Sequence, residues 1–172
     1  RIWHLCIFNV VGSSFARQCD STVFTPAGPG FRVASTKAYV AQVMVISLLA
    51  LYIAQVKETP GVRVPEYVKT MRRLHEYAQL ALELEPDVER LAAEVKDAPL
   101  FFFLGRGADA MVSLEAALNL KEIAYIPTQE SPAGQIKHGP LAPVERGVGA
   151  VFGSAVPGLR GKGRAACEQG RG

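Results

Sequence analysis

Apolar residues along the chain fall into short continuous runs, of the kind that form buried strands, and into longer stretches with helical spacing. The run at residues 100–104 is the clearest of the short ones, and it ends at Gly105-Arg106-Gly107 before a predicted helix at 108–121. Strand, glycine turn and helix in that order are the start of a doubly wound α/β unit. Similar runs at 5–11, 21–25 and 148–152 predict further strands of a parallel sheet.

The middle of the chain has a different pattern. Residues 58–66 carry Pro60, Gly61 and Pro65 in close succession, which makes this stretch the best boundary in the sequence. An amphipathic, charged pattern follows to residue 97 and predicts helices with a break at Pro86. We therefore divide the chain into two incomplete α/β pieces at 1–56 and 99–152, a helical connection between them at 57–98, and an irregular Gly/Arg-rich tail at 153–172.

The apolar stretch at residues 40–54 is the only candidate for a membrane segment. It is shorter than the ~20 residues that span a bilayer, and Gln42 and Ser47 interrupt it. We predict a buried helix and no membrane partner. The formal net charge of +3 gives little support for binding to nucleic acid, so we expect no such partner.

Composition and cysteine usage narrow the class of protein. A chain of 172 residues that is 49% apolar and 20% charged is globular. Cys6, Cys19 and Cys167 are odd in number and have no CxxC spacing, so we expect neither a metal site nor a disulfide framework. We also expect no signal peptide in the first residues. A cytoplasmic protein without a metal or organic cofactor is the expectation.

Two ionisable groups in residues 118–140 are the first candidates for chemistry. Glu122 stands at the end of the predicted helix, and His138 follows Lys137 in a segment broken by Pro and Gly. A carboxylate and an imidazole suit acid/base work near neutral pH. An isolated pair of this kind is more often a solvated helix-end charge and an ordinary loop histidine, and the residues alone leave both interpretations open.

A second candidate lies at the start of the helix that begins near residue 36. Ser35 or Thr36 can cap this helix, and the N–H groups of a helix N-terminus suit sugar hydroxyls or an anion. The alternative is that Ser35 is a cap and nothing more.

Four segments in order carry a family resemblance. They are NVVGSS at 9–14, AGPGFRVASTKAY at 27–39, FLGRG at 103–107, and LEAALNLKEIAYI at 114–126 followed by PAGQIKHGPLA at 132–142. Together they resemble the isomerase half of the glutamine–fructose-6-phosphate aminotransferases, which contains two sugar-isomerase (SIS) subdomains. The resemblance implies an α/β fold, a three-layer αβα sandwich with a parallel sheet, here with parts of two SIS subdomains.

The resemblance also implies roles for single residues. His138 would assist opening of the fructose 6-phosphate ring, and Glu122 would move a proton between C1 and C2. The backbone at Val33, the hydroxyl of Ser35 and Lys137 would contact the sugar phosphate. The substrate would be fructose 6-phosphate, the product glucosamine 6-phosphate, and the full-length protein a homodimer.

The chain departs from the family pattern in places. Asn119 stands where the family has a lysine, and Gln135 replaces the usual acidic residue. The phosphate loop of the first SIS subdomain, the Schiff-base lysine and the glutaminase are not in this sequence, so we expect a fragment that is inactive alone. Two alternatives stay open: a related SIS deglycase or isomerase, and a non-catalytic SIS sensor of a sugar phosphate.

Overall fold

The computed structural model describes residues 2–28, 35–132 and 147–153. The chain divides into two compact units, unit 1 at Arg1–Asp87 and unit 2 at Val88–Gly172. Both units have strands and helices, with parallel strand pairing in each, as the α/β prediction requires.

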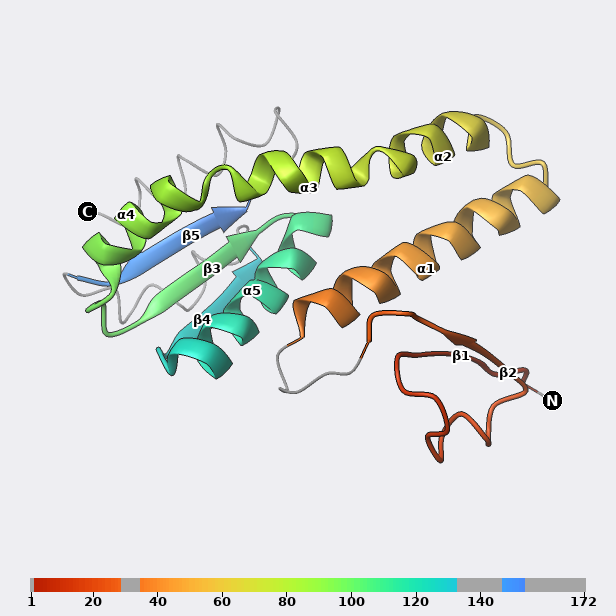
Figure 1. Ribbon diagram of the computed structural model, residues 1–172, viewed down its shortest axis with the longest axis horizontal. Coiled ribbons are helices and arrows are strands. Elements are labelled where there is room, and N and C mark those ends of the chain that lie inside the picture. The colour runs from red at the N-terminus through yellow and green to blue at the C-terminus, as the bar shows by residue number, and fades with distance from the viewer. Residues whose placement is uncertain (1, 29–34, 133–146, 154–172) are drawn as a thin grey trace. The chain divides into compact units, whose positions relative to one another are not determined.

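Unit 1 begins with two short parallel strands, β1 (Leu5–Phe8) and β2 (Ser21–Phe24), drawn in red tones in Figure 1. Leu5 pairs with Ser21 and Phe8 with Phe24, so both strands end at the same edge. The run predicted as a strand at 5–11 is therefore strand only to Phe8. Gly12, with φ of +85°, lies in the turns that follow and has a backbone conformation that L-residues rarely adopt.

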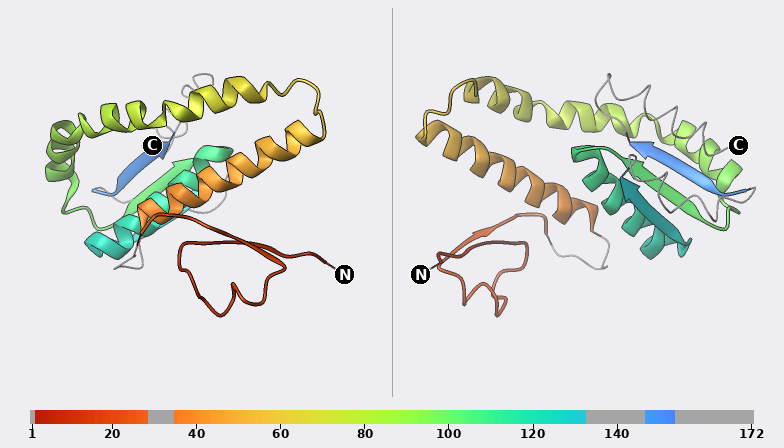
Figure 2. Two further views of the ribbon diagram at one scale, coloured as in Figure 1. Left: turned by 45° about the vertical axis from the view of Figure 1, so that its right-hand side comes forward. Right: turned by 180° about the vertical axis from the view of Figure 1, so that it is seen from behind.

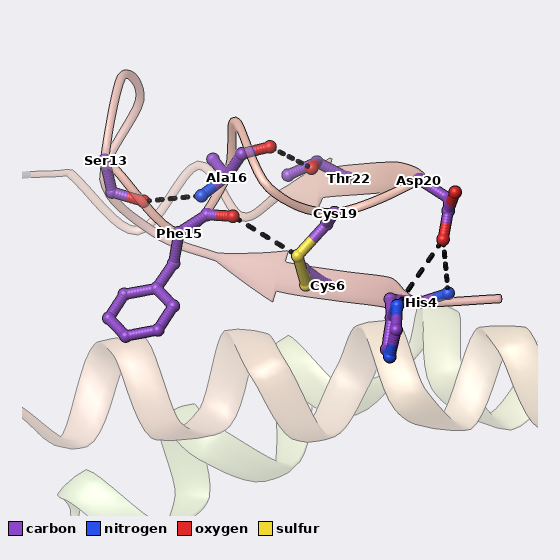
Figure 3. The surroundings of a disulfide bond; sticks show 8 residues. All are labelled: His4, Cys6, Ser13, Phe15, Ala16, Cys19, Asp20 and Thr22. Carbon is purple, nitrogen blue, oxygen red and sulfur yellow. Dashed lines mark hydrogen bonds and ion pairs between the residues drawn. A yellow bond between two sulfur atoms is a disulfide. The ribbon is translucent and has the colours of Figure 1, made fainter. Parts of the chain in front are cut away.

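A disulfide joins Cys6 in β1 to Cys19, which precedes β2 (Figure 3). Our expectation of no disulfide was wrong for this pair. The two Cα atoms lie 6.2 Å apart, a distance that suits a disulfide. The reason is the parallel register: Cys6 pairs with Thr22, which brings the residues just before β2 next to β1 although the bridge spans 13 residues of sequence. Cysteine counting cannot detect such a bridge.

Helix α1 (Thr36–Val56) follows and contacts β1. It is longer than the apolar stretch that predicted it, and it is long and apolar enough, with a mean hydropathy of 1.9, to cross a membrane by length and composition alone. Our prediction of a buried helix was wrong for this structure, because no residue of α1 is buried. Its large apolar side chains face outward on several sides, and Val40 and Tyr52 are among the most exposed.

Three shorter helices fill the connection: α2 (Val64–Arg72), α3 (Leu74–Leu82) and α4 (Glu85–Val95). No strand occurs between residues 57 and 97, all of which the structure describes. Pro86 does not break a helix, contrary to our prediction, since it lies in the first turn of α4. A proline is tolerated there because the first N–H groups of a helix have no partner within the helix. The break before α4 falls at Glu83 and Leu84, just ahead of the predicted position, and a further break at Arg73 separates α2 from α3.

The described residues of unit 2 form a three-stranded parallel sheet with helix α5 across it. Figures 1 and 2 show β3 (Phe101–Gly105) in the centre of this sheet, flanked by β4 (Thr128–Pro132) and β5 (Gly149–Gly153). Helix α5 (Ala108–Ala124) runs back along the strands in the opposite direction. The strand order β4-β3-β5 places the most apolar strand between two neighbours.

The core of unit 2 lies on both faces of β3. Phe101 and Phe103 pack with Ala117 of α5, while Phe102 and Leu104 form a second cluster on the other face. The helical spacing of the sequence predicts a buried face of α5 made of Met111, Leu114, Leu118 and the alanines between them. This is confirmed for Ala117, which is 1% exposed, and wrong for the three large residues, which are each more than 40% exposed. Small residues face the sheet instead, since a short side chain lets the helix approach β3 closely.

Strand β4 was missed by the sequence analysis. Its sequence TQESP is polar and ends in proline, so it resembles a loop. The described sheet has β4 at one edge, where Pro132 at the end of the strand costs few ladder hydrogen bonds. The Thr128 hydroxyl also donates to the Ala117 carbonyl of α5 at 3.1 Å, which ties the strand to the helix.

Candidate functional site

The three strands of unit 2 end in register at one edge. Gly105 of β3 lies opposite both Pro132 of β4 and Gly153 of β5. Ligands of open α/β sheets collect at the carboxyl ends of the strands. Lys137 and His138 follow β4 in the chain but lie outside the residues that the structure describes.

The turn between β3 and α5 is shaped by two glycines. A Cβ on Gly105 would collide with the backbone of Asp109 and Ala110 in the first turn of α5. Gly107 has φ of +59° and ψ of −128°, a conformation that favours glycine. The helix can therefore begin directly over the end of β3, with its N–H groups at the carboxyl edge of the sheet.

Glu122 lies at the other end of α5. The helix rise separates it from Ala108 by about 21 Å, so it is at the edge where the strands begin. Its side chain is exposed, and no hydrogen bond or ion pair to another described residue is found for it. A carboxylate in the last turn of a helix is disfavoured by the helix dipole by ~0.3–1 kcal/mol. Glu122 therefore sits where it does not help the helix, at the edge of the sheet opposite the carboxyl ends of the strands.

Asn119 lies one turn before Glu122 on α5. Its Nδ2 donates to the backbone oxygen of Glu115 at 2.8 Å and to Oε1 of the same residue at 2.9 Å. Its Oδ1 is buried and has no hydrogen-bond partner among the described residues. The Glu115 carboxylate thus already has a hydrogen-bond partner in Asn119, whereas Glu122, seven residues further on, has none among the described residues.

Ser35 stands directly before α1, as predicted, and is its N-cap residue. Its backbone oxygen accepts a hydrogen bond from Tyr39 N–H at 3.1 Å, while its side chain makes no capping hydrogen bond. Capping therefore does not use the Ser35 hydroxyl. Val33 lies outside the described residues.

One well-connected residue of unit 1 was missed. Asn9, directly after β1, accepts at Oδ1 from Ala27 N–H and from the Thr25 hydroxyl, and donates from Nδ2 to the Gly28 carbonyl. The sequence did offer a signal for Asn9. It is a polar residue directly after an apolar strand, and it lies inside one of the four family-like segments.

Of the five predicted site residues, the structure describes Ser35 and Glu122. Ser35 belongs to unit 1 and Glu122 to unit 2, and each is described within its own unit. Val33, Lys137 and His138 are not among the described residues.

Comparisons with known proteins show which family the chain resembles. Residues 94–159 match the SIS domain family. The chain is 43% identical over 144 residues to the glutamine–fructose-6-phosphate aminotransferase [isomerizing] of Clostridium tetani, covering 83% of this chain and 24% of that protein. It is 40% identical over 159 residues to the protein of that name from Symbiobacterium thermophilum, covering 92% and 26%.

A solved structure gives the same answer. The C-terminal domain of glucosamine-fructose-6-phosphate aminotransferase from Francisella tularensis superposes with a TM-score of 0.89 at 32% identity, over 97% of this chain and 48% of that one. The parallel α/β architecture and the matched segment define an SIS-domain protein. More narrowly, the chain has the sequence and fold of part of the isomerase region of the glutamine–fructose-6-phosphate aminotransferases, a family of enzymes. It spans about a quarter of the length of these curated relatives.

Proposed function

We propose that this chain supplies part of the sugar-phosphate site of an enzyme that converts fructose 6-phosphate and glutamine-derived ammonia to glucosamine 6-phosphate. The observation that carries the proposal is the 43% identity over 83% of the chain to a protein whose name states a glutamine–fructose-6-phosphate aminotransferase with isomerizing activity. The fold agreement at a TM-score of 0.89 supports the same region.

The proposed chemistry uses two residues. Glu122 takes a proton from one of the carbons C1 and C2 of the open-chain sugar imine and returns it to the other, which needs a carboxylate not already engaged by the protein. Its exposure and lack of a described partner suit this task. His138 assists ring opening, for which a group that donates and accepts protons near pH 7 is required.

Three residues are proposed to hold the substrate. The Ser35 hydroxyl, which α1 does not use as a cap, donates to or accepts from the sugar. The backbone at Val33 and the Lys137 ammonium contribute further contacts to the sugar phosphate. The family has a lysine at the position of Asn119. The helix that bears Glu122 therefore has one positive charge fewer beside the substrate in this chain.

The test is made in the full-length protein with Glu122→Gln. The amide keeps the shape of the carboxylate but cannot accept a proton. Loss of a general base costs on the order of 10²- to 10⁴-fold in rate, so solvent-deuterium incorporation at C1 or C2 should fall by that factor while affinity for fructose 6-phosphate is kept. Normal incorporation would place the base elsewhere.

Glu115→Gln is the matched control. It makes the same chemical change on the same helix, and the variant keeps an Oε1 that can accept from Asn119. We expect wild-type isotope incorporation from it. His138→Asn should slow turnover of the cyclic sugar and spare an open-chain analogue, because its work ends when the ring is open.

We further propose that the full-length enzyme is a cytoplasmic homodimer in amino-sugar biosynthesis, with no nucleic-acid or membrane partner. The metabolic names of the relatives and the small net charge support this. For α1, the counterpart fold over 97% of the chain favours a core helix of an α/β protein over a membrane span. Membrane fractionation of the full-length protein tests the point.

A further inference from the structure

The end of β1 is tied to the chain that leads to α1 by one side chain. Because β1 and β2 are parallel and in register, Asn9 and Thr25 follow the two strands at the same edge. Thr25 is only 3% exposed and continues the pairing, since its N–H donates to the Phe8 carbonyl at 2.7 Å. The chain beyond Thr25 therefore leaves β2 directly beside Asn9.

The Asn9 carboxamide uses both of its ends. Its Oδ1 accepts from Ala27 N–H at 3.0 Å and lies 3.2 Å from the Thr25 hydroxyl. Its Nδ2 donates to the Gly28 carbonyl at 2.7 Å. Only a side chain with an acceptor and a donor at this reach makes both bonds to the backbone of residues 27 and 28.

Gly28 lies near the start of α1. It has φ of +74°, which favours glycine, and a Cβ built on it would lie 3.8 Å from Nζ of Lys37. Lys37 lies in the first turn of α1, two residues after Ser35. Hydrogen bonds of Asn9 therefore hold Gly28 in the neighbourhood of the helix that bears the Ser35 hydroxyl, and this helix also contacts β1.

We propose that Asn9 is a positioning residue of the sugar-phosphate site, and that its carboxamide fixes the segment 25–28 against which the start of α1, and with it the Ser35 hydroxyl, is placed. The inference rests on the proposed function of Ser35 as a sugar contact. It adds a residue that does not touch the substrate and acts through the backbone.

Asn9→Asp in the full-length protein tests the proposal. An ionised carboxylate still accepts from Ala27 N–H but cannot donate, and it faces the Gly28 carbonyl with negative charge. We expect the Kd for fructose 6-phosphate to rise about 10- to 100-fold. The rate at saturating substrate should change by less than about threefold, since Asn9 does not touch the reacting atoms.

A pH series adds a signature that a general loss of structure would not give. Once protonated, the carboxyl group introduced by Asn9→Asp has one O–H donor and one acceptor, as the amide has a donor and an acceptor. The ratio of the Kd of Asn9→Asp to that of wild type should therefore fall as the pH is lowered from about 8 towards about 5.5, as the new carboxyl begins to protonate. The wild-type series removes the titration of the substrate phosphate from the comparison.

Thr22→Val is the matched control. Thr22 lies in β2, and its hydroxyl donates to the Ala16 carbonyl at 3.3 Å, so the variant also loses one side-chain bond of the same small sheet. It leaves segment 25–28 untouched, and we expect the wild-type Kd. If Asn9→Asp does not fold, Asn9→Ser replaces it, because the shorter hydroxyl cannot bridge residues 27 and 28 and should raise the Kd in the same direction.

A folded Asn9 variant whose Kd is within about twofold of wild type would overturn the inference and leave the proposed function standing. If the wild-type protein itself binds no fructose 6-phosphate, the proposed function fails, and the inference fails with it. The wild-type measurement thus distinguishes the two failures.

Discussion

Unit 1 and unit 2 start from nearly the same sequence signal and differ in burial. In unit 2 all five residues of β3 are buried, because β4 and β5 flank the strand and α5 covers one face. In unit 1, β1 has a single described neighbour and no residue of α1 is buried. An apolar run followed by a glycine turn therefore predicts that a strand forms. Whether this strand is buried depends on the strands and helices that pack against it, which the run itself does not specify.

The difference has a physical origin in the apolar surface that each unit leaves uncovered. The chain spans about a quarter of the length of its curated relatives, and 48% of the solved C-terminal domain that it matches. An apolar face needs partners to leave water, and each Å² left uncovered forgoes about 25 cal/mol. Helix α1 leaves apolar side chains uncovered on several sides, with Val40, Ile46, Tyr52 and Val56 each more than half exposed.

The largest expected effect comes from truncating the centre of unit 2. Leu104 is 1% exposed, and Leu104→Ala should lower the free energy of unfolding of the 172-residue chain by about 2–5 kcal/mol. Ile46→Ala on α1, where the side chain is 55% exposed, should change it by less than about 0.5 kcal/mol. Urea unfolding followed by circular dichroism measures both. Equal losses would show that α1 is packed in solution and would break the comparison.

The disulfide should account for much of the stability of unit 1. In the loop-entropy model a bridge of this span stabilises by about 3 kcal/mol, so Cys6→Ser with Cys19→Ser should lower the stability of β1 and β2 by that order. Hydrogen exchange of the Phe8 and Val23 amides, which the parallel register directs into the β1–β2 ladder, reports on these strands. Cys167→Ser, which leaves the bridge intact, is the control, and unit 2 should keep its protection. Equal exchange in all three proteins would mean that the bridge is not formed in solution.

The uncovered apolar side chains of α1 should drive association of the 172-residue chain. Ile46→Lys replaces one of them with a charge and should weaken self-association by at least about tenfold, measured by sedimentation. The matched variant Leu118→Lys makes the same change at an exposed leucine of unit 2 and should have a smaller effect. A monodisperse wild-type monomer at high concentration would contradict the prediction.

The smallest effect concerns the helix that bears the proposed base. Glu122→Gln removes a negative charge from the last turn of α5, so stability should be unchanged or higher by ~0.3–1 kcal/mol. Thermal unfolding at low ionic strength measures it. A loss of stability would mean that Glu122 has a structural role, and any loss of activity in the variant would then need a different explanation.

Sequence reasoning predicted the fold where the chain follows its own hydrophobic signal. The run at 100–104 became β3 with a shift of one residue, and the helix predicted at 108–121 became α5 with three further residues. Strand β4 could not be found in this way, because its polar residues form a strand only through pairing with β3. Three large residues of α5, Met111, Leu114 and Leu118, are exposed for a related reason, since it is Ala117 that is buried against Phe101 and Phe103.

The site was predictable in part. The position of Ser35 before α1 followed from capping chemistry, and the structure adds that its hydroxyl is not spent on the cap. Asn9 escaped notice because its partners are 16 to 19 residues away in the sequence, and no local pattern reports them. The roles of Glu122 and His138 stay predictions that rest on the family resemblance.

The bridge between Cys6 and Cys19 also has a kinetic consequence. Parallel strands are slow to pair, because the connection between them must close before any ladder hydrogen bond forms. The connection at residues 9–20, all of them described, contains no helix to shorten that search. Once oxidised, the chain keeps Leu5 and Ser21 near each other even when unfolded, so β1 and β2 meet as fast as the strands of a local hairpin. Refolding of the oxidised chain should accordingly be faster than that of the reduced chain, and the order in which oxidation and folding occur determines how quickly Asn9 and Thr25 come together.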